Sequence, residues 1–255
     1  MKAVIHIGLS KTGTTTIQSF LGKNRELLKR QGFFYPISLG QKCAHYELSA
    51  MAFISEMWKL SPLASFLGNH TYSDFLRKDF VPQDQQKLLA KFVDGIMSHC
   101  LHDEHVIFSD EVLAYFTEVE VKRFKNIFDS FFNDFTIVMY LRRQPECLVS
   151  FYNTLASLSS PWNFADYLNL SEEDSFLAYH KIVKHWSIFG KDKLKIRVFD
   201  KQELHDSDLL SDFAHTVGFG MTGLERVKNV SISIDSACTE FLRLFNVHCP
   251  MMQDS

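Results

Sequence analysis

The chain alternates short apolar runs that have the composition of β-strands with longer stretches that have the periodicity of helices. This alternation restricts the fold more than any other feature of the sequence. Runs rich in β-branched or aromatic residues predict strands at residues 3–7, 33–35, 105–108, 135–141 and 194–199. Amphipathic stretches predict helices at residues 15–30, 46–58, 83–100, 119–132, 146–158, 176–189 and 235–246. Because strands that alternate with helices pair in one direction, the sequence predicts an α/β fold with a parallel, doubly wound sheet and helices on both faces.

The length of 255 residues suits one large domain. No internal repeat and no long linker divides the chain, and hydrophobic residues make up 46% of it, which excludes a disordered or low-complexity protein. We therefore expect a single domain over residues 1–255. Residues 40–104 separate the second predicted strand from the third and contain two predicted helices, so we expect them to form a helical insertion in that domain.

The charge balance and the cysteines exclude several classes of partner and site. The formal net charge is −3, so we expect no overall attraction to nucleic acid or to an anionic membrane, and any anion site must be local. The five cysteines include no C-x-x-C pair, which indicates neither a disulfide framework nor a zinc site. No stretch approaches about eighteen apolar residues, and the first residues lack the features of a signal peptide. We therefore expect a cytoplasmic protein without a membrane span.

Residues 8–16 form the most informative segment of the sequence. They leave the first predicted strand, contain Gly8 and Gly13, and open the first amphipathic helix. Glycines let a backbone fold around a phosphate, and the N–H groups at a helix start point toward such an anion, whose charge the helix dipole favours. Five hydroxyl groups and one ammonium group add donors. The segment is therefore predicted to bind phosphate, with an ordinary tight turn as the alternative.

Comparison with the nucleotide-triphosphate loop G-x-x-x-x-G-K-[ST] separates two classes of ligand. Gly8 and Gly13 keep the interval between the glycines and Thr15 keeps the hydroxyl group, which predicts a P-loop NTPase-like core. Thr14, however, stands where that motif has its lysine, and the lysine of this loop is Lys11. A lysine in the middle of the loop suits a 5′-phosphate that carries one further anionic group better than it suits a triphosphate.

A second candidate anion site follows the fourth predicted strand. Arg142 lies at the tip of that strand, Pro145 fits the first turn of a helix, and Ser150 lies in the second turn. The guanidinium group offers a forked contact and the hydroxyl group a single donor, so the two can converge on one anion. Arg143 is the alternative arginine for the same contact.

The two motifs together resemble those of the sulfotransferases that use 3′-phosphoadenosine 5′-phosphosulfate. The sequence K-T-G-T-T after a short strand is similar to the 5′-phosphosulfate loop of that family, and an arginine followed eight residues later by a serine is similar to its 3′-phosphate motif. The resemblance implies that Lys11 contacts the leaving-group oxygen. It also implies a donor site made by Ser10, Lys11, Thr12, Gly13, Thr14, Thr15 and Thr16 at one end and by Arg142 and Ser150 at the other.

The second motif departs from the more common R-x-P-x-x-R-x-x-S pattern of the family. Pro145 stands one position later than in that pattern, and Cys147 stands where the pattern has a second arginine. The eight-residue interval to Ser150 favours Arg142 over Arg143. Residues 195–213 and 226–231 also resemble C-terminal segments of the family, so that the resemblance extends over nearly the whole chain.

Two residues near the carboxyl ends of predicted strands are candidate general bases, because ligands of parallel sheets bind beyond those ends. Glu111 follows the third predicted strand, and His45 begins the helix after the second. Either can take a proton from an acceptor hydroxyl or amine as the sulfur atom is attacked, and Asp110 is expected to be a helix cap. The resemblance implies transfer of a sulfuryl group to a small-molecule or saccharide acceptor without a metal ion.

Two other functions remain open at this point. The first is a P-loop kinase that uses Mg-ATP on a small molecule, because residues 106–111 could form a strand that holds Mg²⁺ through Asp110. The absence of lysine at Thr14 counts against it. The second is a catalytically inactive nucleotide-binding protein, which would bind adenosine 3′,5′-bisphosphate without transferring a group.

Overall fold

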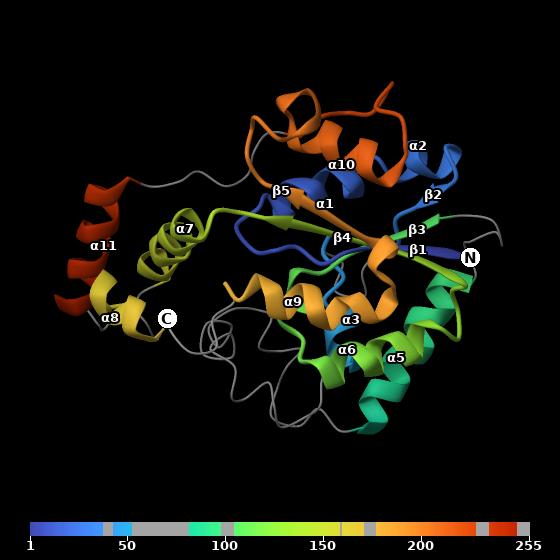
Figure 1. Ribbon diagram of the computed structural model, residues 1–255, viewed down its shortest axis with the longest axis horizontal. Helices are drawn as coiled ribbons and strands as arrows, with labels where there is room; N and C mark the ends of the chain where they lie inside the picture. The colour runs from blue at the N-terminus through green and yellow to red at the C-terminus, as the bar shows by residue number, and fades with distance from the viewer. Residues whose placement is uncertain are drawn as a thin grey trace.

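A parallel sheet forms the centre of the molecule (Figure 1). The structure, a computed structural model, describes residues 1–37, 43–52, 82–97, 105–158, 160–170, 177–227 and 235–248. Within these residues the strands pair in parallel in the order β2-β3-β1-β4-β5. They are β1 (Lys2–His6), β2 (Phe33–Phe34), β3 (His105–Ser109), β4 (Asp134–Leu141) and β5 (Leu194–Val198). All five runs predicted from the sequence are strands, and the predicted parallel sheet is confirmed.

Helices cover both faces of the sheet, as predicted (Figure 1). One face carries α1 (Thr14–Lys23), α2 (Arg25–Arg30) and α10 (Leu209–Val217). The other face carries α3 (Glu47–Ala52), α5 (Pro82–Met97), α6 (Glu118–Phe128) and α9 (Tyr179–Trp186). A further group lies together at one side of the molecule, after the carboxyl end of β4, and consists of α7 (Gln144–Ser157), α8 (Phe164–Leu170) and α11 (Ser236–His248).

Burial on both sides explains why β1, β3 and β4 appear in the sequence as nearly continuous apolar runs. On β1, Ala3 and Ile5 belong to the core beneath α5, α6 and α9, whereas Val4 belongs to the core beneath α1 and α10. The many phenylalanines fill the first of these cores. Phe124 and Phe128, for example, stack with ring centroids 4.2 Å apart, and Phe128 packs edge-on against Phe108 of β3. The central strands are thereby held rigidly, and so are the loops that leave their carboxyl ends.

The predicted helix at residues 15–30 is divided into α1 and α2 at Asn24. The Asn24 side chain donates to Phe20 O within α1 and also forms two hydrogen bonds with the backbone of Glu225, at 2.8 and 2.9 Å. Side chains that bond to backbone groups compete with helix continuation. The division therefore depends on a contact between residues 201 positions apart in the sequence.

The remaining predicted helices agree with the structure where it describes them. The stretches 119–132, 146–158 and 235–246 correspond to α6, α7 and α11. Residues 53–58 and 98–100, which the predicted helices 46–58 and 83–100 include, lie outside the described residues, as does residue 176. Helix α8 was not predicted, although Asn163 accepts a hydrogen bond from the Asp166 amide at 2.9 Å, as a helix cap does.

The region expected to be an insertion, residues 40–104, is described in part. Its helices α3 and α5 contribute Leu48, Met51, Phe92 and Ile96 to the same core as the sheet. The boundaries of the insertion stay a prediction, as does the single domain over residues 1–255. None of the described helices is both long and apolar enough to cross a lipid bilayer.

Candidate active site

The loop after β1 is shaped by residues in the left-handed backbone region. Gly8 has a φ of +98° and Gly13 one of +78°, values that glycine adopts without steric cost. Hydrogen bonds fasten the loop to β4: Tyr140 N donates to Gly8 O at 2.8 Å, and Leu9 N donates to Tyr140 O at 3.2 Å. The Thr12 hydroxyl group donates to Leu9 O at 2.5 Å and closes the turn from inside. The path of the loop is therefore fixed by the sheet.

Helix α1 begins at the end of this loop with its first N–H groups directed toward it. Gly13 O accepts from the amides of Thr16 and Ile17, at 3.0 and 3.1 Å, and no side chain caps the helix start. The first N–H groups of a helix have no partner within the helix, and together with the helix dipole they favour an anion. A Cβ atom at position 13 would also overlap the end of the Leu209 side chain, which would have to move to admit it. The start of α1 is uncapped and faces the loop, and phosphate binding there stays a prediction.

Lys11 lies in the middle of the loop and turns toward α7. Its Nζ donates to Thr154 Oγ1 at 2.6 Å and lies 5.5 Å from the centre of the Phe151 ring. Burial lowers the pKa of Lys11, while the negative charge of Glu111 acts in the opposite direction. The ammonium group is thus partly desolvated and close enough to Glu111 for the two charges to interact.

Arg142 lies against the same loop. Its Nη1 donates to the main-chain oxygen of Lys11 at 3.2 Å, and its guanidinium group lies 5.8 Å from the centre of the Phe199 ring. Arg143 instead extends outward, with 71% of its side chain exposed, and forms an ion pair with Asp200. Of the two arginines that the sequence leaves open, the structure places Arg142 beside the phosphate loop.

Ser150 lies on α7, one turn before Thr154. The Thr154 hydroxyl group donates to Ser150 O at 3.0 Å while it accepts from Lys11. Ser150 is therefore joined to the loop lysine through Thr154. The Arg142 side chain forms a separate ion pair with Glu146 of α7, at 3.3 Å. The main-chain oxygen of Arg142 accepts a hydrogen bond from the Tyr179 hydroxyl group at 2.7 Å.

Glu111 follows β3 and packs directly on the loop. A Cβ atom at Gly8 would lie 3.1 Å from Glu111 Cβ, so any larger residue would push the two segments apart by a few tenths of an ångström. The carboxylate of Glu111 accepts hydrogen bonds from Gln18 Nε2 at 2.7 Å and from the Tyr46 hydroxyl group at 3.1 Å. The preceding residue, Asp110, is fully buried and caps the short helix of residues 111–115, as the sequence predicts.

His45 is placed differently from Glu111. Its ring is fully buried between Tyr35 and Phe108, with Nε2 bound to Pro36 O at 3.0 Å and Nδ1 accepting from Ser109 N at 3.2 Å. Because Nδ1 accepts from an amide, the ring proton lies on Nε2. Burial lowers the pKa of His45 to about 4. Both nitrogens of this candidate base are therefore engaged by the backbone, and no lone pair faces the loop.

The buried state of His45 predicts how stability depends on pH. Between about pH 6.5 and pH 4 the unfolded chain binds a proton at residue 45 that the folded chain does not, so the free energy of unfolding falls as the pH falls. His6, whose pKa burial lowers to about 3, acts in the same direction. In urea titrations over this range, we expect His45→Asn to reduce the slope of stability against pH by up to about 1.4 kcal/mol per pH unit. Parallel curves for the two proteins would contradict the assignment.

Several residues of the site were missed by sequence reasoning. Gln18 and Tyr46 contact Glu111, Thr154 contacts Lys11, and the buried hydroxyl group of Tyr115 lies beside Ser10. A signal existed for Gln18, which is a polar residue on the buried stripe of an amphipathic helix and is only 4% exposed. The others depend on tertiary contacts that spacing does not show.

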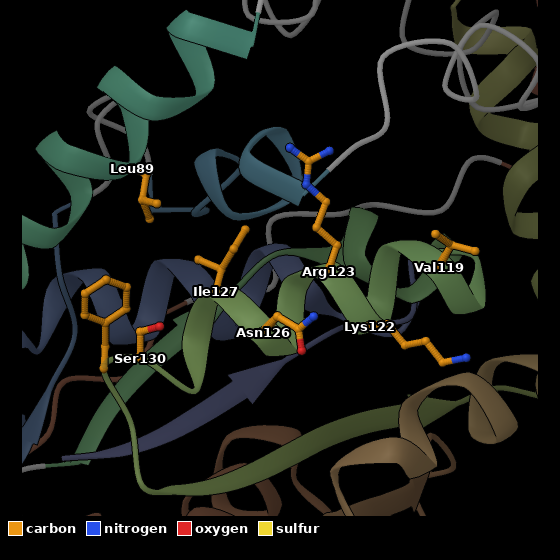
Figure 2. Close-up of a pocket in the computed structure, with 8 residues that line it drawn as sticks. Leu89, Val119, Lys122, Arg123, Asn126, Ile127 and Ser130 are labelled. Carbon is orange, nitrogen blue, oxygen red and sulfur yellow. The ribbon is translucent and has the colours of Figure 1, made fainter.

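A shallow hollow of about 570 Å³ lies elsewhere, along the outer side of α6 (Figure 2). In Figure 2, Lys122 and Arg123 leave the helix in different directions, and Leu89 of α5 lies at the far end. None of its lining residues belongs to the loop after β1 or to the ends of β3 and β4. Among the described residues there is also no group of three histidine, cysteine or acidic side chains arranged to hold a metal ion.

Comparison with solved structures identifies the fold as a sulfotransferase fold. A sulfotransferase from Alicyclobacillus acidocaldarius superposes with a TM-score of 0.54 and 17% sequence identity, over 97% of this chain and 92% of the other. The sulfotransferase domain from the curacin biosynthetic pathway gives a TM-score of 0.44 and 12% identity, over 88% of this chain and 76% of the other. No family model matches the sequence, and no curated protein matches it.

Proposed function

We propose that the protein is a sulfotransferase that moves a sulfuryl group from 3′-phosphoadenosine 5′-phosphosulfate to a hydroxyl or amine group of a small-molecule or saccharide acceptor. The observation that carries the proposal is the convergence of three groups on one loop. Lys11 lies within it, the Arg142 guanidinium group is bonded to its backbone, and Glu111 packs on Gly8. The sulfotransferase fold supports the same assignment.

The residues around the loop fit a donor that carries an anion at each end. The uncapped start of α1 suits the 5′ end, where Thr15 is exposed and the buried hydroxyl group of Tyr115 lies beside Ser10. The hydroxyl group of Thr12 is already bonded to Leu9, so Thr12 would contribute its amide. The 3′-phosphate would be held by Arg142, with Ser150 of α7 as the second donor.

The chemistry assigned to this chain rests on two charged side chains. The donor, when bound, supplies a sulfur electrophile joined through an oxygen atom to a good leaving phosphate. The Lys11 ammonium group would stabilise the negative charge that grows on that oxygen as the sulfur–oxygen bond breaks. Glu111 would accept the proton of the acceptor as the new bond to sulfur forms. We do not assign this step to His45, because both of its nitrogens are bound to the backbone.

The kinase alternative receives less support from the geometry. Asp110, the residue that would hold Mg²⁺, uses Oδ1 to accept from Val112 N at 2.9 Å and Oδ2 to accept from Ser49 N at 3.0 Å. Both carboxylate oxygens of Asp110 are therefore already bonded to main-chain amides. Thr14 also leaves the start of α1 without the lysine that contacts the β- and γ-phosphates of a nucleoside triphosphate.

Calorimetry distinguishes these functions. We expect adenosine 3′,5′-bisphosphate to bind one site per chain in the presence of EDTA, because the loop amides, Lys11 and Arg142 supply the positive field. ATP with Mg²⁺ is expected to bind more weakly. Binding of ATP that requires Mg²⁺, without binding of the bisphosphate, would favour the kinase. Bisphosphate binding without transfer of ³⁵S-labelled sulfate to any component of a metabolite extract would favour the inactive nucleotide-binding protein.

A further inference from the structure

Glu111 is held by two side chains that sequence reasoning did not include in the site. We propose that Gln18 and Tyr46 are positioning residues for Glu111, and that they make Oε1 the oxygen atom that receives the proton of the acceptor. This inference rests on the proposed function, in which Glu111 is the base. The two contacts come from different elements, α1 and the turn before α3, and each binds a different carboxylate oxygen.

Gln18 is fixed in one orientation. Its Nε2 uses one hydrogen for Glu111 Oε2, at 2.7 Å, and the other for Ser109 Oγ, at 3.2 Å. Turning the amide over would bring its oxygen atom against the carboxylate, which repels it. Gln18 is 4% exposed, so water does not compete for these contacts. Its amide nitrogen can only donate, and it therefore stabilises the ionised form of Glu111 and not a form protonated at Oε2.

Tyr46 differs from Gln18 because a phenol group can donate or accept. Its hydroxyl group donates to Oε1 of the ionised carboxylate at 3.1 Å. When Oε1 receives a proton, the same hydroxyl group can rotate and accept a hydrogen bond from it. Protonation at Oε1 therefore keeps a hydrogen bond at each oxygen, whereas protonation at Oε2 would set an O–H group against an N–H group. The geometry assigns the proton to Oε1.

The hydrogen-bond chain behind Gln18 ends in an uncharged group. Ser109 Oγ lies 2.8 Å from His6 Nδ1, and burial lowers the pKa of His6 to about 3. The imidazole is therefore neutral at ordinary pH, and the chain keeps Glu111 in place without adding a charge behind it. The titratable groups that do face Glu111 are Lys11 of the loop, Asp110 before it, and the phenols Tyr35, Tyr46 and Tyr115.

The titration of Glu111 tests the inference without any acceptor. In protein labelled with ¹³C at the glutamate side-chain carboxyl carbon, the Glu111 signal is assigned by its loss in Glu111→Gln and followed against pH. We expect Gln18→Met to move the midpoint upward by about one pH unit, since it removes a donor that serves only the ionised form. Tyr46→Phe should move it upward by about half as much, because the phenol group serves both forms. Tyr167→Phe, on α8, is the matched control and should not move it.

Two outcomes overturn the inference or part of it. Midpoints within about 0.2 pH unit of the wild type in both variants would show that neither side chain positions Glu111. A larger shift in Tyr46→Phe than in Gln18→Met would assign the proton to Oε2. If Gln18→Met does not fold, the test rests on Tyr46→Phe. An upward shift of the Glu111 midpoint in that variant supports the inference, and an unchanged midpoint contradicts it. Failure of the proposed function is seen in a different measurement, as the absence of adenosine 3′,5′-bisphosphate binding to the wild-type protein. That result would not alter the titration shifts in the variants.

Discussion

Replacement of Lys11 by alanine is expected to slow sulfuryl transfer about 100- to 1,000-fold while the protein remains folded. The ammonium group is the cation that lies within the loop, and its partial burial strengthens its interaction with charge that develops nearby. A preorganised donor of this kind acts mainly on the transition state, so the loss should appear in kcat more than in the affinity for the donor.

The measurement is the rate at which ³⁵S from labelled 3′-phosphoadenosine 5′-phosphosulfate enters an acceptor. Lys11 has a φ of +66°, a region that asparagine tolerates better than alanine, so Lys11→Asn removes the charge with less backbone strain. Lys23→Ala, which removes the exposed partner of Glu225 at the end of α1, is the control. Turnover close to wild type in both Lys11 variants would remove this residue from the mechanism.

Replacement of Arg142 by alanine is expected to weaken the binding of adenosine 3′,5′-bisphosphate about 10- to 100-fold. The guanidinium group lies between the loop backbone and the Phe199 ring, where it can hold one phosphate of the ligand by charge-assisted hydrogen bonds. Arg143→Ala provides a control at the adjacent position, because that side chain is 71% exposed and is paired with Asp200.

Calorimetry on the two variants gives the comparison directly. We expect Arg143→Ala to keep the affinity of the wild type and both variants to keep its thermal stability. Adenosine 5′-monophosphate, which lacks the 3′-phosphate, should bind the Arg142 variant and the wild type with similar affinity. An equal loss of affinity for both ligands would show that Arg142 acts on the loop and not on the 3′-phosphate.

The centre of the sheet could be predicted from the sequence because β1, β3 and β4 are largely buried on both faces and are therefore mostly apolar. The turn after β1 could also be predicted from local sequence, since Gly8 and Gly13 supply the backbone angles that it requires. The break at Asn24 could not be predicted in this way. It depends on Glu225, which the sequence places 201 residues away.

The choice between His45 and Glu111 as the general base could not be made from the sequence. His45 and Tyr46 are neighbours at the start of α3, and spacing alone gives no reason to prefer one side chain over the other. The structure turns His45 into an aromatic enclosure and Tyr46 toward Glu111. The direction of a side chain at a helix start depends on how the helix packs. Helix α3 packs into the core through Leu48 and Met51. The sequence around these residues does not show where that core lies relative to the loop after β1.

The central position of β1 in the sheet affects the order in which parts of the protein can fold during synthesis. Lys2 pairs with His105 on one side and with Asp134 on the other, so β1 is synthesised well before the two strands with which it pairs. Nor can the following turn be fastened before Tyr140 emerges. A nascent polypeptide that has not yet extended past β4 therefore lacks the fastened loop that we propose binds the nucleotide.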